Sequence, residues 1–331
     1  MIKKSDNIFS IIIPCRRISN FLLKKTLPAI TSQSYPFYQI IIVTNQLKIT
    51  KIPQVEIIKT DNTNPAHMRN LGAKKAKGPY LCFIDDDVYP SFNWLNNASR
   101  LLKLHPHKSA VCGPNLTPAK SSFSQKLSGC FWQSPLGAGQ FYYRNLPAKS
   151  RLVNDFPSSN LIIKKSAFNQ IKGFDCHFWP GEDTKLCHDL VYKLKKPILY
   201  HPSLTVYHQR RSFPQKHLLQ LNRYATHRGF FVKYLPKTSK LPVYFLPSIF
   251  SLYQIMLMSL YIIKSPFNLL NQVLTLPFYL YAVLTVLNSL WLIKHRHPII
   301  ASILSIPVII VSHFSYGIFF IIGLLKKDLL R

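Results

Sequence analysis

The sequence predicts an α/β fold, a mostly parallel sheet flanked by helices, followed by an α-helical membrane region. Short apolar runs rich in β-branched residues alternate with helical spacings through the first 210 residues or so. Three aspartates follow one of these runs directly, and three long apolar segments make up the C-terminal third. A chain of 331 residues is long enough for one sizeable α/β domain and a further region.

The first half of the chain begins as a strand–helix–strand unit. Residues 9–14 and 39–44 are apolar β-branched runs, and residues 20–32 between them have the helical spacing of Leu and Ile. The elements expected next are a strand over 55–59, a helix over 66–76, a strand over 80–84, a helix over 94–104, loops and sheet edge over 113–160, a strand around 161–163, a helix from Ser166 that ends near Gly173, a helix from 183 to 195 and a strand over 200–208.

An acidic triplet, Asp85 to Asp87, comes directly after the predicted strand over 80–84. In open α/β sheets, ligands bind at the carboxyl ends of the strands. Since residues i and i+2 of an extended segment point the same way, Asp85 and Asp87 could face one hard cation while Asp86 turns into the fold. The alternative is a solvated turn or a cap for the following helix.

A second acidic pair, Glu182 and Asp183, follows Pro180 and Gly181 at the predicted start of a helix. One interpretation is that Asp183 or Thr184 caps this helix and the acids complement its dipole. The other is that a carboxylate held here beside Trp179 acts as a general base.

Together these segments resemble the family 2 glycosyltransferases with the GT-A fold, over about residues 8 to 235. The resemblance rests on Arg69-Asn70-Leu71-Gly72 ahead of the strand that ends in the acidic triplet, and on Gly173-Phe174-Asp175 followed by Glu182-Asp183. It implies a membrane-anchored, inverting, metal-dependent enzyme that transfers a sugar from a nucleotide-sugar donor to a glycan or lipid-linked acceptor.

The resemblance also implies roles for individual residues. Asp183 would be the base, with Glu182 assisting it or positioning the acceptor. Asp85 and Asp87, with His208 as a possible third ligand, would hold Mg²⁺ or Mn²⁺. The donor-binding residues would be Pro14, Asp61, Arg69, Asp85 and Asp86. The residues expected at the acceptor or its phosphate are Trp179, Arg210, Arg211, Gln220 and Arg223, the last two from a segment similar to the QxxRW motif of membrane glycosyltransferases.

The identity of the nucleotide stays open in the sequence. Members of the family often carry an aspartate after the second strand, where this chain has Thr44-Asn45. Asp61 past the third strand could substitute for it, or it could simply form a turn with Asn62. For His208, Arg210 and Arg211 a structural or solvated role is the alternative to ligand binding.

The charge and the apolar segments indicate a membrane protein. The net charge of the chain, +30, is compatible with binding to nucleic acid or to an anionic membrane. The sequence has no helix-turn-helix, zinc-finger or RNP-like string, so no nucleic-acid partner is expected and a membrane is favoured. Only six of the 42 Lys and Arg residues lie beyond Lys240, so the catalytic domain is expected on the cytosolic side. Six cysteines without metal-ligand spacing suggest reduced thiols, and the N-terminus does not read as a signal peptide.

The expected organisation is a catalytic domain over 1–212, an amphipathic basic interface helix and linker over 213–240, and membrane helices over 241–331. The apolar segments are 241–263, 267–293 and 298–325, each long enough to span. The last of them contains Pro307 and a polar stretch over 313–317, and is expected to be re-entrant or interfacial. Two rival functions are a nucleotidyl- or phosphosugar transferase and a basic membrane-associated protein that binds nucleic acid or lipid without catalysis.

Overall fold

The computed structural model describes residues 9–47, 51–262 and 269–328. Residues 1–8 of the N-terminal segment that is not expected to be a signal peptide, and the predicted ends of apolar segments at Ile263 and Phe267, lie outside these ranges. The chain forms two compact units, one of Met1–Pro118 with Leu146–Gln209 and one of Ala119–Asn145 with Arg210–Arg331. The expected division into catalytic, interface and membrane regions stays a prediction, and residues 119–145 belong to the second compact unit rather than to the first.

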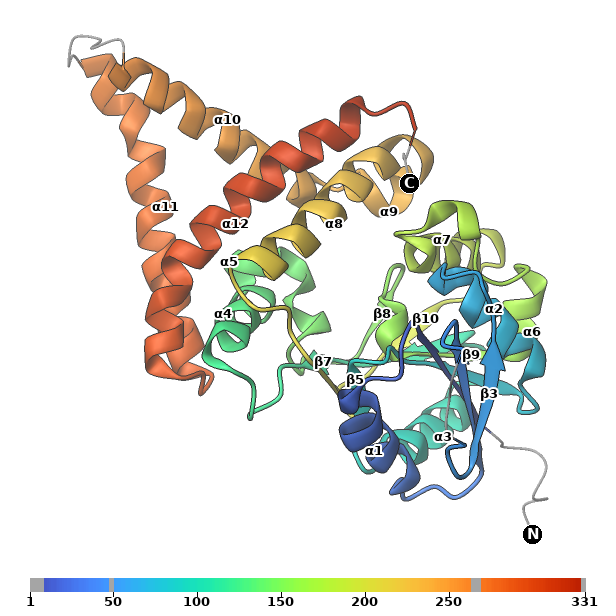
Figure 1. Ribbon diagram of the computed structural model, residues 1–331. Coiled ribbons are helices and arrows are strands. Elements are labelled where there is room, and N and C mark those ends of the chain that lie inside the picture. Colours follow the sequence, from blue (N-terminus) through green and yellow to red (C-terminus); the bar gives the residue numbers. More distant parts are fainter. Residues whose placement is uncertain (1–8, 48–50, 263–268, 329–331) are drawn as a thin grey trace. The chain divides into compact units, whose positions relative to one another are not determined.

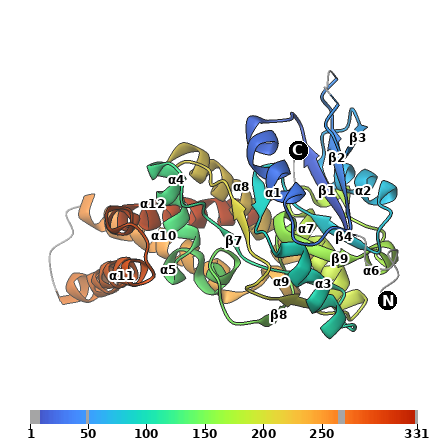
Figure 2. The same cartoon turned by 90° about the horizontal axis from the view of Figure 1, so that it is seen from below.

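A mixed eight-stranded sheet forms the centre of the first unit. Its strands, in chain order, are β1 (Phe9–Cys15), β2 (Tyr38–Thr44), β3 (Val55–Lys59), β4 (Tyr80–Phe83), β6 (Ala110–Cys112), β8 (Arg151–Val153), β9 (Leu161–Lys164) and β10 (Ile198–Tyr200). They are arranged in the order β3-β2-β1-β4-β9-β6-β10-β8. The first four strands are parallel, as Figure 2 shows, whereas β9 is antiparallel to both of its neighbours. The carboxyl ends of β1 to β4 therefore share one edge.

A small second sheet continues from that edge. It contains β5 (Val88–Pro90), β7 (Asn115–Leu116) and β11 (Val206–His208), in the order β5-β11-β7. The predicted single strand over 200–208 is wrong, because Tyr200 ends β10 in the large sheet and Val206 starts β11 in the small one. The intervening residues turn through Pro202, and Leu204 N donates to His201 O at 3.2 Å.

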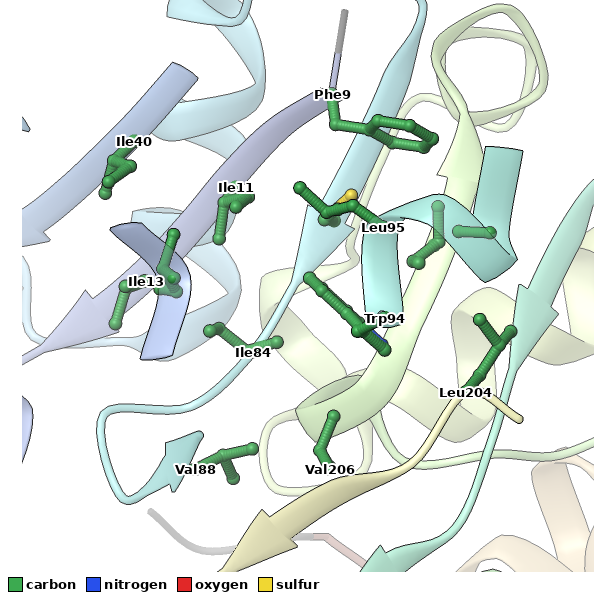
Figure 3. Packing of buried hydrophobic residues seen from close by; sticks show 14 of the residues in the cluster. Phe9, Ile11, Ile13, Ile40, Ile84, Val88, Trp94, Leu95, Leu204 and Val206 are labelled. Carbon is green, nitrogen blue, oxygen red and sulfur yellow. The ribbon is translucent and has the colours of Figure 1, made fainter. Parts of the chain in front are cut away.

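Helices cover both faces of the large sheet (Figure 1). In chain order they are η1 (Leu22–Thr26), α1 (Leu27–Thr31), α2 (Pro65–Lys75), α3 (Trp94–Leu104), η3 (Ser158–Asn160), α6 (Lys165–Gln170), η4 (Cys176–Phe178), α7 (Glu182–His188) and η5 (Asp189–Lys193). On one face, Ile11, Ile13 and Ile40 pack with residues of η1, α1 and α3 in a single buried cluster, part of which Figure 3 shows around Trp94. The alternation of side chains along a strand sends Ile12 to the opposite face, under α2.

Gly72 lets α2 lie close to that second face. A Cβ at this position would be 2.5 Å from Ile12 Cγ2 and 3.3 Å from Val43 Cγ2. Glycine costs helix stability, so its presence inside α2 has a packing reason. It brings the backbone of α2 against β1 and β2, and thereby fixes the position of the side chains at the start of that helix.

Asn160 joins three separate segments in the interior of the first unit. Its side chain is fully buried; Oδ1 accepts from Trp94 Nε1 at 3.0 Å, and Nδ2 donates to Gly113 O at 2.6 Å and Leu204 O at 2.7 Å. One amide thus ties the start of α3, the end of β6 and the turn before β11 together.

The second unit is helical. Its elements are α4 (Phe123–Trp132), α5 (Pro135–Ala138), η2 (Gly139–Arg144), α8 (Gln215–Tyr234), α9 (Pro236–Ser239), α10 (Pro242–Ile262), α11 (Leu269–Lys294) and α12 (Ile299–Leu325). By length and composition, Pro242–Ile262, Val273–Lys294 and Ile299–Leu325 could each cross a membrane. The loops expected over 113–160 are wrong where α4 forms. Ser122 and Gln125 make a reciprocal capping box at its start, and this pair was the sequence signal for the helix.

Two expectations for the helices of this unit can be compared with the structure. The last apolar segment, expected to be re-entrant or interfacial, forms one continuous helix, α12, through Pro307, and its position relative to a membrane stays a prediction. The helix over 214–234 forms as α8 but is not basic all along its outer side, because Arg228 is buried. Arg228 Nη2 donates to Tyr224 Oη at 3.0 Å, and its guanidinium lies 4.8 Å from the centre of the Tyr244 ring.

We predict that Asn160→Ala lowers the free energy of unfolding of the first unit by about 3 kcal/mol. The substitution leaves a buried indole N–H and two buried carbonyls without their partner, and each such loss costs roughly 1–3 kcal/mol. Thermal unfolding of the detergent-solubilised chain measures the effect. Asn169→Ala, at an exposed position of α6, is the matched control and is expected to change the midpoint little. Equal midpoints for the two variants would contradict the role given to Asn160.

Candidate active site

Arg69 connects the two acidic clusters. It lies on α2 with only 4% of its surface exposed. Its Nη2 donates to Asp85 Oδ1 and its Nη1 donates to Glu182 Oε1, both at 2.7 Å. Segments that the sequence separates by about a hundred residues, the end of β4 and the start of α7, therefore meet at one guanidinium.

The charge of Arg69 is maintained by these partners. Burial alone would lower the pKa of Arg69, but the charges of Asp85 and Glu182 raise it above its usual value. A buried cation is stable only when it is paired and hydrogen-bonded. Arg69 was expected to contact the donor; the structure gives it two carboxylates instead, and a donor contact stays a prediction.

Asn70 holds the loop that carries the second acidic cluster. Its Nδ2 donates to Phe174 O at 2.8 Å, and its Oδ1 accepts from Phe174 N at 2.9 Å. Gly173, at φ +79°, lies so close that a Cβ there would be 2.6 Å from Asn70 Oδ1. Asn64, which caps α2, adds a bond from Nδ2 to Cys176 O at 3.1 Å. Two consecutive residues of α2 therefore make different contacts: Arg69 binds the acids, and Asn70 binds the loop before α7.

Glu182 and Asp183 have different environments although they are adjacent. Glu182 is buried, and its Oε2 accepts from Gly181 N at 3.0 Å while Oε1 is bound to Arg69. Asp183 is partly exposed, and its Oδ1 accepts from Thr184 N at 2.8 Å. Both oxygens of Glu182 are thus occupied, whereas Asp183 is the acid of this pair that reaches the surface of the site.

A third carboxylate, which the sequence analysis did not single out, lies behind Asp183. Asp155 is buried, and its Oδ1 accepts from Thr184 Oγ1 at 3.1 Å. Burial, together with the negative charges of Glu182 and Asp155, raises the pKa of Asp183 to about 7. A carboxylate with such a pKa can accept a proton near neutral pH.

The acidic triplet does not point at one place. All three aspartates are partly exposed, and the inward turn expected of Asp86 stays a prediction. Asp85 Oδ1 is bound to Arg69, while Asp87 Oδ1 lies 3.3 Å from His208 Nε2. The pairing of Val88 with His208 between β5 and β11, together with Gln209 N donating to Asp87 O at 2.9 Å, places these two side chains next to each other.

The residues present can contribute to a metal site but do not complete one. Within residues 9–47, 51–262 and 269–328, no group of three or more His, Cys, Asp or Glu side chains could hold a metal ion by itself. Asp87 and His208 converge and offer one oxygen and one nitrogen. Mg²⁺ is commonly held by one or two carboxylates together with substrate phosphates and water, so this pair fits a divalent ion that arrives with a diphosphate.

The remaining predicted donor residues lie near the shared strand edge. Pro14 is buried in β1 one residue before its end, and Asp61 is exposed two residues after β3. Because β1, β2, β3 and β4 are parallel, these positions belong to the edge at which Asp85 follows β4.

The predicted acceptor residues are divided between the two units. Trp179 is partly exposed and lies just before α7 in the first unit. In the second unit, Arg210 is buried and its Nη2 donates to Asn145 Oδ1 at 2.9 Å, whereas Arg211, Gln220 and Arg223 are exposed. An acceptor role for these residues stays a prediction.

Comparison with known proteins agrees with the motifs. Residues 10–172 match the family model described as "Glycosyl transferase family 2". The chain is 28% identical over 148 residues to the pre-mycofactocin glycosyltransferase of Mycobacterium tuberculosis; the match covers 45% of this chain and 30% of that relative.

Solved structures of low sequence identity also resemble the chain. S. aureus TarS 1–349 in complex with UDP-GlcNAc is 13% identical, with a TM-score of 0.45, and the match covers 66% of each chain. GalNAc-T7 with UDP, GalNAc and Mn²⁺ is 13% identical, with a TM-score of 0.49, and covers 71% of this chain and 51% of that one. On the family match and the motifs that Arg69 joins, the chain carries a glycosyl transferase family 2 domain, followed by helices long and apolar enough to span a membrane.

Proposed function

We propose that the protein is an inverting glycosyltransferase that takes a sugar from a nucleotide-sugar donor and transfers it to an acceptor hydroxyl at the cytosolic face of a membrane. The observation that carries the proposal is the bridge from Asp85 through Arg69 to Glu182. This bridge brings the acidic cluster after β4, which is proposed to bind the donor, close to the start of α7. There Asp183, whose pKa is raised, is proposed to act on the acceptor.

Asp87 and His208 would hold a divalent ion, Mg²⁺ or Mn²⁺, against the donor diphosphate. When bound, such an ion neutralises charge that develops on the leaving diphosphate. Asp85 has one oxygen committed to Arg69, so we assign it a supporting role in this site. The edge formed by Pro14, Asp61 and Asp86 would bind the nucleoside portion.

Asp183 would take the proton of the acceptor. The acceptor oxygen then attacks the anomeric carbon as the bond to the diphosphate oxygen breaks, and the nucleoside diphosphate leaves with its electron pair. Glu182 cannot share this task while both of its oxygens are bound, so it positions Asp183 by fixing the start of α7 to Arg69. Trp179 lies before the same helix and would contact the acceptor.

The acceptor is proposed to be a glycan or a lipid-linked molecule, because the chain carries helices that could cross a membrane. Exposed basic residues of the second unit, including Arg211 and Arg223, would contact its phosphate or anionic lipid. No nucleic-acid partner is proposed. A screen of nucleotide sugars for metal-dependent hydrolysis or transfer by the detergent-purified protein tests this function directly. Absence of turnover with every donor, alongside salt-dependent binding to nucleic acid, would overturn it.

We predict that Asp183→Asn abolishes transfer while donor binding persists. The amide has nearly the same size but cannot accept the proton, and general base catalysis contributes roughly 10²- to 10⁴-fold in rate. Single-turnover transfer and donor affinity are measured together for wild type, Asp183→Asn and the matched variant Glu182→Gln. Wild-type turnover in Asp183→Asn with an inactive Glu182→Gln would move the base to Glu182. Wild-type turnover in both would exclude the acid-pair mechanism.

The raised pKa of Asp183 predicts opposite effects of pH on activity and on stability. Activity is expected to rise with pH through about 7, as Asp183 loses its proton. Because the pKa in the folded state lies above the value near 3.8, the folded chain binds more protons than the unfolded chain in this interval. The Asp183 contribution to stability is therefore present at low pH and is lost as pH rises toward 7.

The stability part of this prediction is measured by unfolding wild type and Asp183→Asn at pH 5 and pH 8. Asp183→Asn is expected to gain stability relative to wild type on going from pH 5 to pH 8. A stability difference that does not change between these pH values would contradict the raised pKa, whatever the activity.

We predict that Asp87→Ala removes metal-dependent nucleotide binding without unfolding the chain. Calorimetry with Mn²⁺ and UDP or GDP, with and without the metal, measures this loss. The matched control is Glu56→Ala, which removes an exposed carboxylate on β3 that is bound to Gln39 Nε2 at 2.7 Å. Mn²⁺-dependent affinity that survives in Asp87→Ala at the level of Glu56→Ala would remove Asp87 from the metal site.

A further inference from the structure

The three long apolar helices of the second unit form the sides of a triangle (Figure 1). α11 meets the start of α12, where Ser289 Oγ donates to Ser302 O at 2.8 Å. α10 meets the later part of α12, where Ser248 Oγ donates to Gly317 O at 3.0 Å and the Phe245 and Phe320 rings are 5.0 Å apart. α12 is therefore the side that joins the end of α11 to the beginning of α10.

This arrangement constrains how the chain can lie in a bilayer. α10 and α11 also contact each other, where Tyr253 Oη donates to Leu274 O at 2.6 Å, and Tyr281 of α11 lies 2.9 Å from His313 Nδ1 of α12 through its Oη. If these two consecutive helices cross the bilayer and return, the beginning of α10 and the end of α11 lie on the same side. Since α12 joins those two places, both of its ends lie on that side too.

The later half of α12 is covered by α8. Two glycines make the approach very close: a Cβ on Gly229 would be 2.2 Å from Phe320 O, and one on Gly323 would be 2.0 Å from Thr226 O. His217 Nε2 lies 3.0 Å from Ser312 Oγ, and Lys233 Nζ donates to Lys326 O at 3.1 Å. α8 thus follows α12 from about residue 312 to 326, as both Figure 1 and Figure 2 show.

The exposed side of α8 is mostly polar and charged. Lys216, Gln220, Arg223 and Lys233 are exposed there, together with Leu219 and Tyr234. Charged side chains within the hydrocarbon are costly, so α8, and with it the half of α12 that it covers, belongs at the membrane surface rather than across the bilayer.

The first half of α12 has a different surface. Its exposed residues are all apolar up to Phe314: Ile299, Ile300, Ile303, Leu304, Pro307, Ile310, Val311 and Phe314. From Ser315 to Ile321 no side chain is exposed. The outer face of α12 is therefore apolar and exposed over residues 299–314, whereas residues 315–321 are covered by protein.

From these contacts we propose that α12 lies along the bilayer surface instead of crossing it. Lipid contacts α10, α11 and the exposed apolar face of α12, and the α10–α11 pair is the part that crosses. Lys326 and Lys327 then share a side with Lys237, Lys240, Lys294 and Arg296, so that the basic residues at these helix ends gather at one anionic surface, as the positive-inside rule favours. This proposal is independent of the proposed activity.

Side-specific labelling tests the topology on the full chain. Single cysteines are placed in a Cys176→Ser background at Lys237, Arg296 and Lys327, and at Tyr261, which is 86% exposed near the end of α10. An impermeant maleimide is applied to sealed membrane vesicles before and after detergent treatment. The first three positions are expected to share one labelling pattern and Tyr261→Cys to show the reverse. Labelling of Lys327→Cys in the pattern of Tyr261→Cys would mean that α12 crosses the bilayer and would overturn the proposal.

Depth measurements by nitroxide labels provide a second test with an internal control. Ile303 and Phe314 on α12 are exposed and separated by the same number of residues as Leu276 and Leu287, which are exposed on α11. At 1.5 Å per residue, a helix along the membrane normal separates such positions by roughly 16 Å in depth. The α11 pair is expected to approach this difference and the α12 pair to stay within about a third of it. Equal depth differences for the two pairs would contradict the surface position of α12.

Discussion

The buried ion pairs of Arg69 are the constraint on which the arrangement of the site depends. A guanidinium with 4% exposure cannot stay charged inside the fold without partners, and its two carboxylates come from segments far apart in the chain. Neither carboxylate could be so placed if α2 stood further from the sheet. The close packing of Gly72 against Ile12 is therefore needed to place Arg69 between its two carboxylates.

On the proposed function, the acids have different roles because they have different partners. Asp85 and Glu182 are each neutralised in part by Arg69, whereas Asp87 lies beside His208 and Asp183 is partly exposed. Asp87 faces an imidazole, whereas burial and the negative charges of Glu182 and Asp155 raise the pKa of Asp183. One of these surroundings suits a cation bound with diphosphate and the other suits a proton acceptor, although both residues are aspartates.

Much of the fold could be predicted because buried strands of a parallel sheet are continuous apolar runs, as in residues 9–15 and 40–43. The Arg69-Asn70-Leu71-Gly72 motif could also be recognised in the sequence, but the pairing of Arg69 with Asp85 and Glu182 could not. Asp155 was missed because its link to Thr184 joins residues far apart in the chain and has no local pattern. The strand over 200–208 was wrong because apolar character continued past Pro202, whereas the backbone turned from one sheet into another.

Buried arginines are stabilised differently in the second unit than in the first. Asp328 is its only acidic residue, so buried arginines here cannot be neutralised as Arg69 is. Arg228 is held instead by Tyr224 and by the face of the Tyr244 ring, which stabilise a cation without removing its charge. The positive charge of this unit is therefore balanced by almost no carboxylate of its own. With α12 along the bilayer, that charge gathers on one surface, where anionic lipid can balance it.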